Sequence, residues 1–333
     1  MKICILHRFP KDRIKETNVS ITFLLRDGVV IKTFRKFDRM NPTWKLLKSL
    51  IWILYAPLLV IFRSYDIIYC DDSFPFYAGL VKFFCPKSKV IIRLGDLHLM
   101  YYLEGRAYDF AHWLEVKEWK FVDDVIPISQ TMSNFIYKET GLMFQHIKDP
   151  VNLDDFDIKP DPHKDPPIVM FHGTITRNKG LDKIIRASHK LPDVRFIIVG
   201  EGEDRQRLES FNCPNVRFTG WIPYSRVKEC IAKASIGLAM RSHNRGNQYV
   251  VTSAWLQYCA VGIPCIVSER DVFKDMEYPW TFNTVERLVV LIRDLLDKPE
   301  NYKSYVTFHH DARKIGDKIW FRLLSSVEQS PRN

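Results

Sequence analysis

Two patterns of apolar and polar residues alternate along the chain. Short runs rich in β-branched and other apolar residues recur between longer stretches whose apolar positions follow helical spacing. In the first half the strand-like runs are residues 2–6, 66–70, 89–94 and 124–129, and the helical stretches are 43–62 and 109–122. Apolar strands separated by helices predict a parallel sheet that is covered on both faces.

The same alternation returns in the second half. Strand-like runs occupy 168–173, 195–200, 216–220, 236–240 and 264–268, and helical stretches occupy 180–191, 203–211, 224–234 and 250–262. Regular alternation of strands and helices predicts a doubly wound α/β domain. Such sheets bind ligands at the carboxyl ends of their strands, where loops lead into helices.

A proline-rich segment, residues 156–168, separates the two halves and contains four prolines. Prolines at this density break regular structure, so we place the domain boundary here. The first domain is predicted to span 1–157 and the second 166–310. The chain has 333 residues, which is enough for two domains that each bury a core.

The end of the chain predicts one more amphipathic helix over 312–330. Its apolar positions recur every four residues, at Ile315, Ile319, Leu323 and Val327. We expect this helix to pack back on the first domain.

Composition indicates an ordinary globular protein with an anionic partner. Hydrophobic residues make up 46% and charged residues 26%, and the formal net charge is +10. A nucleotide diphosphate, a nucleic acid or an acidic membrane would each suit that charge. Lysine and arginine are spread along the chain without a long run, so no nucleic-acid partner is expected.

The seven cysteines are odd in number and include no C-x-x-C pair. Four of them, Cys70, Cys230, Cys259 and Cys265, lie in apolar stretches and are predicted to be buried thiols in a reducing compartment. Residues 1–7 are interpreted as a buried strand rather than as a secretory signal. These features favour a cytoplasmic location.

A membrane contact is considered for residues 50–62, "LIWILYAPLLVIF". The run is too short to span a bilayer, which needs about 20 apolar residues. Lys45, Lys48 and Arg63 flank it, as suits a helix lying peripherally at a membrane surface. A buried helix broken at Pro57 fits equally well.

A candidate phosphate site follows the strand that ends at Gly173. The loop "GTITRNKG" carries Arg177 and Lys179, and Gly180 opens a helix. A helix N-terminus attracts phosphate, and fixed cations stabilise the negative charge that grows on a departing diphosphate. The alternative is a solvated basic loop.

Two further segments of the second half carry candidate donor contacts. Gly200 and Gly202 follow a strand, but Arg205 takes the place of the third glycine of a dinucleotide fingerprint, so a tight turn is the favoured interpretation. Thr252 and Ser253 offer hydroxyls at a helix start. Gln257 lies about one turn later, where an exposed helical residue is the alternative.

Taken in order, these segments resemble the C-terminal half of the retaining glycosyltransferases of family four, which have the GT-B fold. The resemblance is carried by "GTITRNKGLDKIIRA", "IVGEGED", "VRFTGW" and "LQYCAVGIPCI". Upstream, "DDVIPIS" and "KDPVNLDDF" are similar to the family's segments at the end of its first domain. The small size and divergent motifs resemble compact members found in large DNA viruses.

The resemblance implies two Rossmann-like domains facing across a cleft and a nucleotide-sugar donor bound without a metal. Lys179 matches the family's phosphate-binding lysine. The family's arginine falls at Thr174, for which Arg177 is the nearest substitute. The family's two glutamates fall at Tyr249, which cannot replace a carboxylate, and at Gln257, whose amide can still hydrogen-bond the ribose.

The first domain is expected to present the acceptor. After the strand in "RLGDLH", Asp96 or His98 is the candidate to contact the donor sugar. The family's glycine-rich first loop is missing, and His7, Arg8 and Lys11 stand there instead. Asp71 and Asp72 raise the possibility of a metal-binding acidic motif, but strand-end carboxylates are the favoured interpretation, so no metal ligands are assigned.

The sequence therefore predicts an enzyme of glycan biosynthesis, a hexosyltransferase. It would move mannose from GDP-mannose, or next glucose from UDP-glucose, to a glycan or glycoprotein acceptor, with a homodimer left open. The alternative is a non-catalytic GT-B protein that binds a nucleotide sugar or glycan. The catalytic candidates are Lys179, Arg177, His98 and Asp96. The donor-binding candidates are Gly173, Thr174, Gly200, Gly202, Thr252, Ser253, Gln257 and Tyr249.

Overall fold

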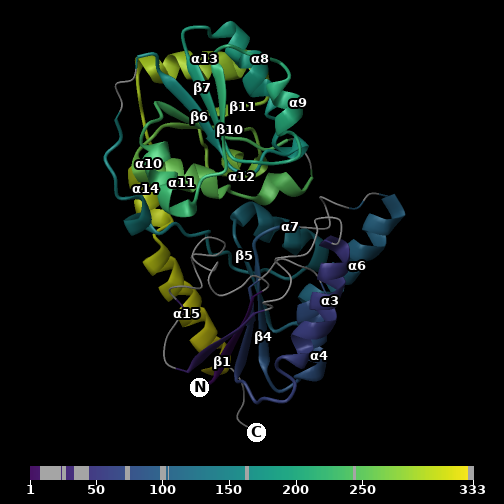
Figure 1. Cartoon of the computed structure of the whole chain (residues 1–333). Helices are drawn as coiled ribbons and strands as arrows, with labels where there is room; N and C mark the ends of the chain where they lie inside the picture. The colour runs from purple at the N-terminus through teal and green to yellow at the C-terminus, as the bar shows by residue number, and fades with distance from the viewer. Residues whose placement is uncertain are drawn as a thin grey trace. The chain divides into compact units, whose positions relative to one another are not determined.

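The computed structural model describes residues 1–7, 24, 28–33, 45–71, 76–97, 103, 105–161, 165–242 and 245–328. The chain divides into two compact units. The first comprises Met1–Asp149 and Ala312–Asn333, and the second comprises Pro150–Asp311. Each unit is built on its own parallel sheet (Figure 1).

The first unit contains a five-stranded sheet in the order β2-β1-β3-β4-β5. The strands are β1 Ile3–His7, β2 Val29–Thr33, β3 Ile67–Cys70, β4 Lys89–Leu94 and β5 Asp124–Pro127. All neighbours pair in parallel. The four strands expected in this half are confirmed, whereas β2 was not anticipated because its apolar run is only three residues long.

The described helices of this unit are α3 Lys45–Leu58, α4 Tyr77–Phe84, α6 Gly105–Phe121, α7 Gln130–Thr140 and the terminal α15 Ala312–Glu328. Of these, α3, α4 and α6 each connect two parallel strands. Pro57 lies in the last turn of α3. Proline cannot donate an amide hydrogen bond, and the helix ends one residue later.

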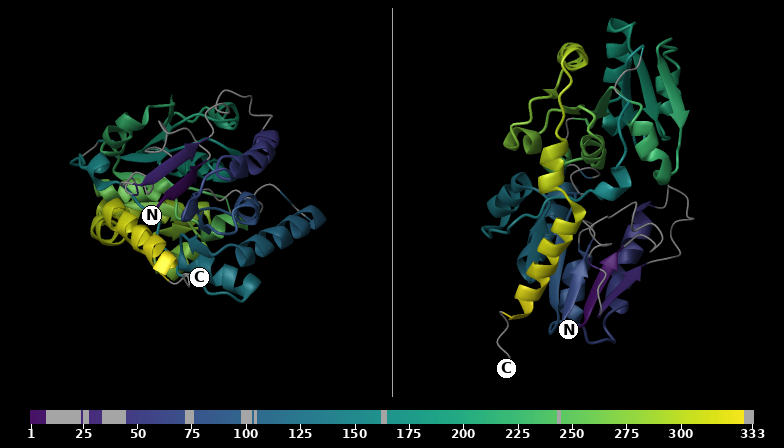
Figure 2. Two further views of the ribbon diagram at one scale, coloured as in Figure 1. Left: turned by 90° about the horizontal axis from the view of Figure 1, so that it is seen from below. Right: turned by 90° about the vertical axis from the view of Figure 1, so that its left-hand side faces the viewer.

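The terminal helix α15 contributes to the core of the first unit. Ile315, Ile319 and Leu323 are buried in one cluster with Ile5 on β1 and Ile91 on β4. Figure 2 shows α15 lying along this sheet. The first unit is therefore assembled from both ends of the chain.

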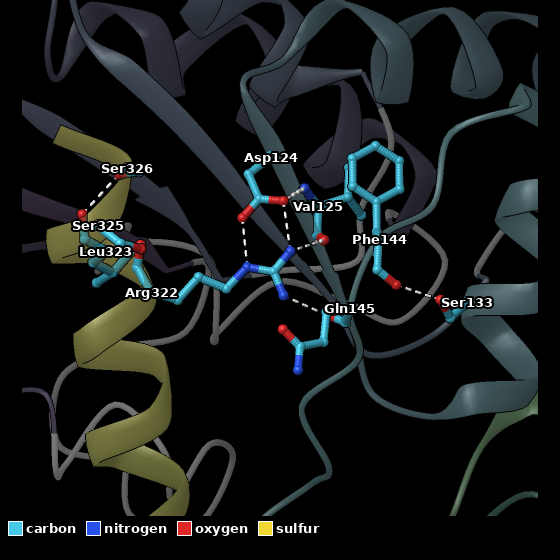
Figure 3. Close-up of polar contacts among 9 residues, drawn as sticks. All are labelled: Asp124, Val125, Ser133, Phe144, Gln145, Arg322, Leu323, Ser325 and Ser326. Atoms are coloured by element: carbon cyan, nitrogen blue, oxygen red, sulfur yellow. Dashed lines mark hydrogen bonds and ion pairs between the residues drawn. The ribbon is translucent and has the colours of Figure 1, made fainter. Parts of the chain in front are cut away.

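A bidentate ion pair fixes α15 to the edge strand β5 (Figure 3). Nε of Arg322 donates to Oδ2 of Asp124 at 2.6 Å, and its Nη2 donates to Oδ1 at 2.7 Å. The same guanidinium also donates to the backbone carbonyls of Val125 and Gln145. Both charged side chains are about one-fifth exposed, at 19% and 20%, so water screens the pair only in part.

The second unit contains a six-stranded sheet in the order β11-β10-β9-β6-β7-β8. The strands are β6 Ile168–His172, β7 Arg195–Val199, β8 Val216–Gly220, β9 Ile236–Ala239, β10 Cys265–Ser268 and β11 Thr281–Phe282. The five strands predicted from the sequence are confirmed. The sixth, β11, has two residues, too few to leave an apolar pattern.

The helices of the second unit are α8 Asp182–Lys190, α9 Arg205–Glu209, α10 Val227–Ile231, α11 Ser253–Val261, α12 Asp271–Asp275, α13 Val285–Asp297 and α14 Lys303–His309. Short 3-10 turns are η3 Leu153–Phe156, η4 Arg177–Lys179, η5 Tyr224–Arg226 and η6 Gly246–Tyr249. Because parallel crossovers are right-handed, α8 and α9 cover one face of the sheet and α10 and α11 the other.

Helix α11 sits close to the sheet because β9 has a glycine beneath it. A Cβ on Gly237 would lie 2.3 Å from the ring of Tyr258. The hydroxyl of Tyr258 donates to the carbonyl of Met170 on β6 at 2.8 Å. This contact sets the position of α11 relative to the central strand β6.

All seven cysteines are free thiols. Cys70, Cys259 and Cys265 are buried as predicted, and burial raises the pKa of each. Cys230 is only partly buried, which corrects the prediction for that residue; it lies on the short helix α10, one side of which faces solvent. Among the described residues, no helix has the length and apolar character needed to cross a bilayer.

Because the ion pair between α15 and β5 is partly buried, removing Arg322 should lower the free energy of unfolding more than removing the more exposed Arg293. Arg322→Met should lower the free energy of unfolding of the first unit by about 1–3 kcal/mol, because Asp124 loses a partly buried, charged hydrogen-bond donor. The matched control is Arg293→Met. Arg293 also makes a bidentate pair, with Asp193, but both side chains are about half exposed, at 48% and 56%.

Urea denaturation followed by circular dichroism measures both variants. The control should unfold like the wild type, since exposed ion pairs contribute little to stability. Equal losses in the two variants would show that the attachment of α15 does not depend on this pair.

Candidate functional site

Four loops converge at the carboxyl edge of the second sheet. They follow β10, β9, β6 and β7, which are neighbours in the sheet in that order. Parallel strands all end at the same edge, so residues 173–181, 200–204, 240–242, 245–252 and 269–270 are brought together there. Most of the donor-binding residues predicted from the sequence lie in these loops.

Backbone hydrogen bonds hold the β6 and β7 loops against each other. The amide of Gly173 donates to the carbonyl of Val199 at 2.9 Å, and that of Ile175 donates to the carbonyl of Glu201 at 2.9 Å. The amide of Asp204 returns a bond to Ile175 at 3.2 Å. The two loops therefore form one layer of backbone.

Gly200 and Gly202 make this contact possible. A Cβ on Gly200 would lie 1.9 Å from the carbonyl oxygen of Gly173, and one on Gly202 would lie 2.0 Å from that of Ile175. Gly200 also has φ +138°. No side chain fits in either place. Close packing of the two loops therefore requires glycine at both positions of the tight turn that the sequence predicted.

The two cations of η4 lie in different surroundings. Arg177 is 81% exposed, and its Nε lies 3.8 Å from Oδ1 of Asp204. It lines a surface groove together with Arg186, His189 and Arg207. Lys179 is half-buried and close enough to His172 to influence its ionisation. Arg177 is therefore the more exposed of the two cations and neighbours Asp204, whereas Lys179 neighbours His172.

On the β7 side of the site, the negative charge of Asp204 is balanced by an arginine. It is 2% exposed, and its carboxylate accepts two hydrogen bonds of 2.6 Å from Arg207. Arg207 holds the pKa of Asp204 below its usual range. Arg177 is a second, longer-range partner of the same carboxylate.

His172 was not predicted as a site residue. It ends β6, and its ring lies 4.8 Å from that of Tyr258 on α11. Its Nε2 is buried and has no hydrogen-bond partner among the described residues. Burial, reinforced by the charge of Lys179, lowers the pKa of His172 to about 4, so the ring is neutral at pH 7. Its signal in the sequence was a lone polar residue ending an otherwise apolar strand.

The β9 loop is braced from both sides. The amide of Ser242 donates to the carbonyl of Asn178 in η4 at 2.7 Å, and the amide of Arg241 donates to Oγ of Ser268 at 2.7 Å. Nη1 of Arg241 donates to Oδ1 of Asn247 at 3.0 Å. The buried Arg270 donates to the carbonyl of Val250 at 2.6 Å. The loop before α11 is thus fixed to its neighbours.

The start of α11 is capped by Thr252. The buried Thr252 hydroxyl accepts a hydrogen bond from the amide of Trp255 at 3.4 Å, as expected of an N-cap residue. Ser253 is exposed at the first helical position, and Gln257 is partly buried one turn later. The first amides of this nine-residue helix have no partner within the helix.

Thr174 and Tyr249 differ in their surroundings. Thr174, at the position of the family's arginine, is exposed next to Gly173. Tyr249 is partly buried at the end of η6, four residues before α11 begins. Both lie in loops at the carboxyl edge, as their positions in the sequence implied.

The first unit has its own polar group at the carboxyl edge of its sheet. Arg93 on β4 is buried, and its Nη2 donates to Oδ1 of Asp149 at 3.1 Å. Burial raises the pKa of Asp149 to about 6; Arg93 opposes that rise, and the nearby Asp96 and Asp71 add to it. Asp96 is half-buried after β4.

Several predicted residues lie outside the described residues: His98, Asp72, Arg8 and Lys11. The side chain of His7 is likewise outside the description. Over the described ranges, no group of three or more histidine, cysteine, aspartate or glutamate residues is placed to hold a metal ion.

A known protein family matches the part of the chain that forms most of the second unit. Residues 154–313 match the family described as "Glycosyl transferases group 1". The chain is 31% identical over 118 residues to the lipopolysaccharide core biosynthesis glycosyltransferase LpsE of Rhizobium meliloti (strain 1021). The match covers 34% of this chain and 32% of LpsE, so it spans about a third of that relative's length.

Solved structures resemble the whole chain. HepE of Anabaena, in complex with UDP and glucose, aligns with a TM-score of 0.75 at 13% identity, covering 98% of this chain and 100% of HepE. Sucrose-phosphate synthase of Thermosynechococcus elongatus aligns with a TM-score of 0.77 at 14% identity and the same coverage. The likeness confirms the predicted fold, two Rossmann-like α/β domains of the GT-B type.

The loop contact predicts that Gly202→Ala is strongly destabilising. The added methyl group cannot fit beside the carbonyl of Ile175, so the free energy of unfolding should fall by about 1–3 kcal/mol or more. The control is Gly79→Ala on α4, where a Cβ would meet Glu118 at an ordinary 3.5 Å. Alanine in a helix should leave stability unchanged or raise it by about 0.5–1 kcal/mol.

Thermal or urea unfolding of both variants measures the difference. A Gly202 variant as stable as the Gly79 variant would contradict the tight loop contact.

Proposed function

We propose that this chain, whose residues 154–313 match glycosyl transferases group 1, is a retaining, family-four glycosyltransferase. Its nucleotide-sugar donor would bind at the carboxyl edge of the second sheet. One observation carries this proposal: a half-buried lysine, a close-packed pair of glycine loops and a helix N-terminus come together on neighbouring strands. The names of the relatives support a transferase.

Lys179 is assigned to the donor diphosphate. It lies in the turn after β6, and its loop is hydrogen-bonded to the β9 loop through Asn178 and Ser242. The amides at the start of α11 add a second source of positive potential. Gln257, one turn along the same helix, is assigned to the ribose hydroxyls.

Arg177 takes a smaller part in this proposal than the sequence indicated. Its guanidinium lies on the side of Asp204 and is mostly exposed. It would reach the diphosphate only by leaving that carboxylate. Thr174 and Ser253, both exposed at the loop ends, are retained as hydroxyl donors to the phosphate oxygens.

The proposed chemistry needs a stabilised leaving group. The bond between the anomeric carbon and a diphosphate oxygen breaks, and the electron pair stays with the diphosphate. An acceptor hydroxyl forms the new bond on the same face of the sugar, and its proton passes to the departing diphosphate oxygen. The Lys179 ammonium and the helix dipole would stabilise the growing negative charge, a role that a divalent metal fills in other enzymes.

The donor is proposed to be GDP-mannose, with UDP-glucose second. The first choice comes from the family resemblance. The second gains support because HepE of Anabaena has been solved in complex with UDP-glucose. Asp96 and His98 are proposed to contact the donor sugar, and a glycan or glycoprotein is the proposed acceptor.

A second candidate function is binding without turnover. Tyr249 and Gln257 stand where the family has two glutamates, so the carboxylate that contacts the donor sugar is replaced by a phenol. A single-turnover assay with radiolabelled GDP-mannose or UDP-glucose and a mixed glycan acceptor separates the two functions. A glycan product supports the enzyme, whereas bound donor without any product favours the binding protein.

We also propose a cytoplasmic location and kinship with compact viral members, both suggested by the sequence. A homodimer is left open.

Lys179→Ala should weaken donor binding about 10- to 100-fold, since a charged contact to phosphate contributes about 1.5–3 kcal/mol. Isothermal titration calorimetry with GDP, GDP-mannose, UDP and UDP-glucose measures this. Lys190→Ala is the matched control, because Lys190 lies at the far end of α8 and pairs with Glu286. The control should bind like the wild type, as should Asp71→Ala with Asp72→Ala.

Equal affinity of the Lys179 variant and the wild type would discard this site. Circular dichroism of both lysine variants checks that each is folded.

Donor binding should also raise the pKa of His172. A diphosphate beside Lys179 adds negative charge next to the ring and favours the imidazolium form, so the pKa should move up from about 4. NMR titration of histidine side chains with and without GDP or UDP measures the shift, and His172→Asn assigns the resonance. A downward shift, or none with the nucleotide bound, would place the diphosphate elsewhere.

A further inference from the structure

The helical layer formed by α3, α4 and α6 exposes a large amount of apolar surface. Helix α4 packs between α3 and α6 on one face of the first sheet (Figure 1). The exposed large apolar residues of this layer are Leu54, Tyr55, Leu58, Phe62, Phe83, Phe84, Phe110, Trp113 and Phe121. Single exposed apolar residues are ordinary, but a group of this size on one layer indicates a contact surface.

Topology places four phenylalanines at one edge of the layer. Each of α3, α4 and α6 connects two parallel strands, so all three run against the strands and finish at the amino edge of the sheet. Phe83, Phe84 and Phe121 end α4 and α6, and Phe62 follows α3. Their exposed fractions are 67%, 48%, 51% and 89% in that order. We call these four residues the phenylalanine row.

Helix α6 extends this surface along its length. Phe110, Trp113, Lys117 and Phe121 recur at spacings of three and four residues, which places them on one side of the helix. The rings of Phe110 and Trp113 are stacked with centroids 6.1 Å apart. Nζ of Lys117 lies 5.7 Å above the Trp113 ring. A tryptophan with a lysine beside it suits the boundary between lipid chains and headgroups.

The charges around the phenylalanine row are predominantly positive. Arg63, Lys87 and Lys120 are exposed and lie within three residues of a phenylalanine of the row. The nearby carboxylates already have cationic or amide partners. Asp123 lies 2.7 Å from Nζ of Lys82, and Asp66 accepts a 2.6 Å hydrogen bond from the amide of Lys2 and lies 4.0 Å from the N-terminal ammonium.

We propose that the phenylalanine row and its cations form a docking surface for an anionic lipid bilayer. The rings would enter the headgroup region, and the cations would meet lipid phosphates. A symmetric contact with a second copy is disfavoured, because an isologous dimer sets each patch against itself and would bring these cations together. The surface lies at the amino edge, so the carboxyl edge of the same sheet stays available for other ligands.

The proposal extends the membrane hypothesis drawn from residues 50–62. That hypothesis rested on one helix, α3, whose 14 residues cover roughly 21 Å and cannot span a bilayer. The structure adds residues from α4 and α6 that no hydrophobic run in the sequence marks. Contact would be made by the ends of three helices and one side of α6 rather than by α3 alone.

Vesicle co-sedimentation of the full chain tests the docking surface. The wild type should bind phosphatidylcholine vesicles that contain phosphatidylglycerol, and bind pure phosphatidylcholine much more weakly. Phe62→Ser with Phe83→Ser should weaken binding to the anionic vesicles by about tenfold or more, since two rings that would be buried in the bilayer are lost. The control is Phe211→Ser with Phe308→Ser, which changes two residues of the second unit that are 51% and 69% exposed.

Charge is tested separately by Lys87→Gln with Lys120→Gln. This variant should bind anionic vesicles several-fold more weakly and show a smaller dependence on salt. Tryptophan fluorescence of the wild type should shift to shorter wavelength on binding, and Trp113→Phe should reduce that shift, since the chain has eight tryptophans. All substitutions are at exposed positions, and circular dichroism checks that the variants are folded.

Three results would overturn the proposal: no binding of the wild type to anionic vesicles, equal loss in the control pair, or unchanged binding in the phenylalanine variant. Light scattering adds a fourth. A dimeric wild type that becomes monomeric in the phenylalanine variant would identify the surface as an interface between copies. Donor binding by calorimetry is read independently, so failure here leaves the donor site untouched.

Discussion

The carbonyl oxygens of Gly173 and Ile175 determine how the second unit presents its loops. Each lies where a side chain on Gly200 or Gly202 would have to be, so the loops after β6 and β7 meet backbone to backbone. That contact fixes the turn η4, and through Asn178 and Ser242 it fixes the β9 loop as well. Lys179, His172 and the start of α11 take their positions from this chain of backbone contacts. The candidate site is therefore organised by main-chain geometry before any side chain is considered.

The fold could be read from the sequence where apolar runs were long. Nine strands were predicted, and each is present, because continuous apolar runs between helices are typical of buried parallel strands. The two missed strands, β2 and β11, lie at sheet edges. β11 has only two residues, and β2 has five residues but an apolar run of only three. Helices α4, α7, α12, α13 and α14 were also missed. Four of them are short, at 5 to 11 residues, but α13 has 13 residues with a clear apolar face and could have been predicted.

The sequence could predict which edge of the sheet each site residue lies at, but not what its side chain contacts. The sequence located Lys179, Thr252 and Gln257 at the carboxyl edge, since loops after parallel strands must lie there. It could not show that Arg177 and Lys179 point toward different partners, because that depends on the turn of η4. Nor could it show that His172 is neutral, because its ionisation depends on burial and on a lysine seven residues away.

Because α15 completes the core of the first unit, that unit cannot finish folding until residues 312–328 have been made. Its sheet is made first, whereas Ile315, Ile319 and Leu323 are made only after the whole second unit. The second unit is one continuous segment and needs no later residues. Translation of the intervening 150–311 takes roughly 10–30 seconds at 5–20 residues per second, during which the apolar face awaiting α15 stays uncovered. The unit whose translation starts first is therefore the unit that finishes folding last.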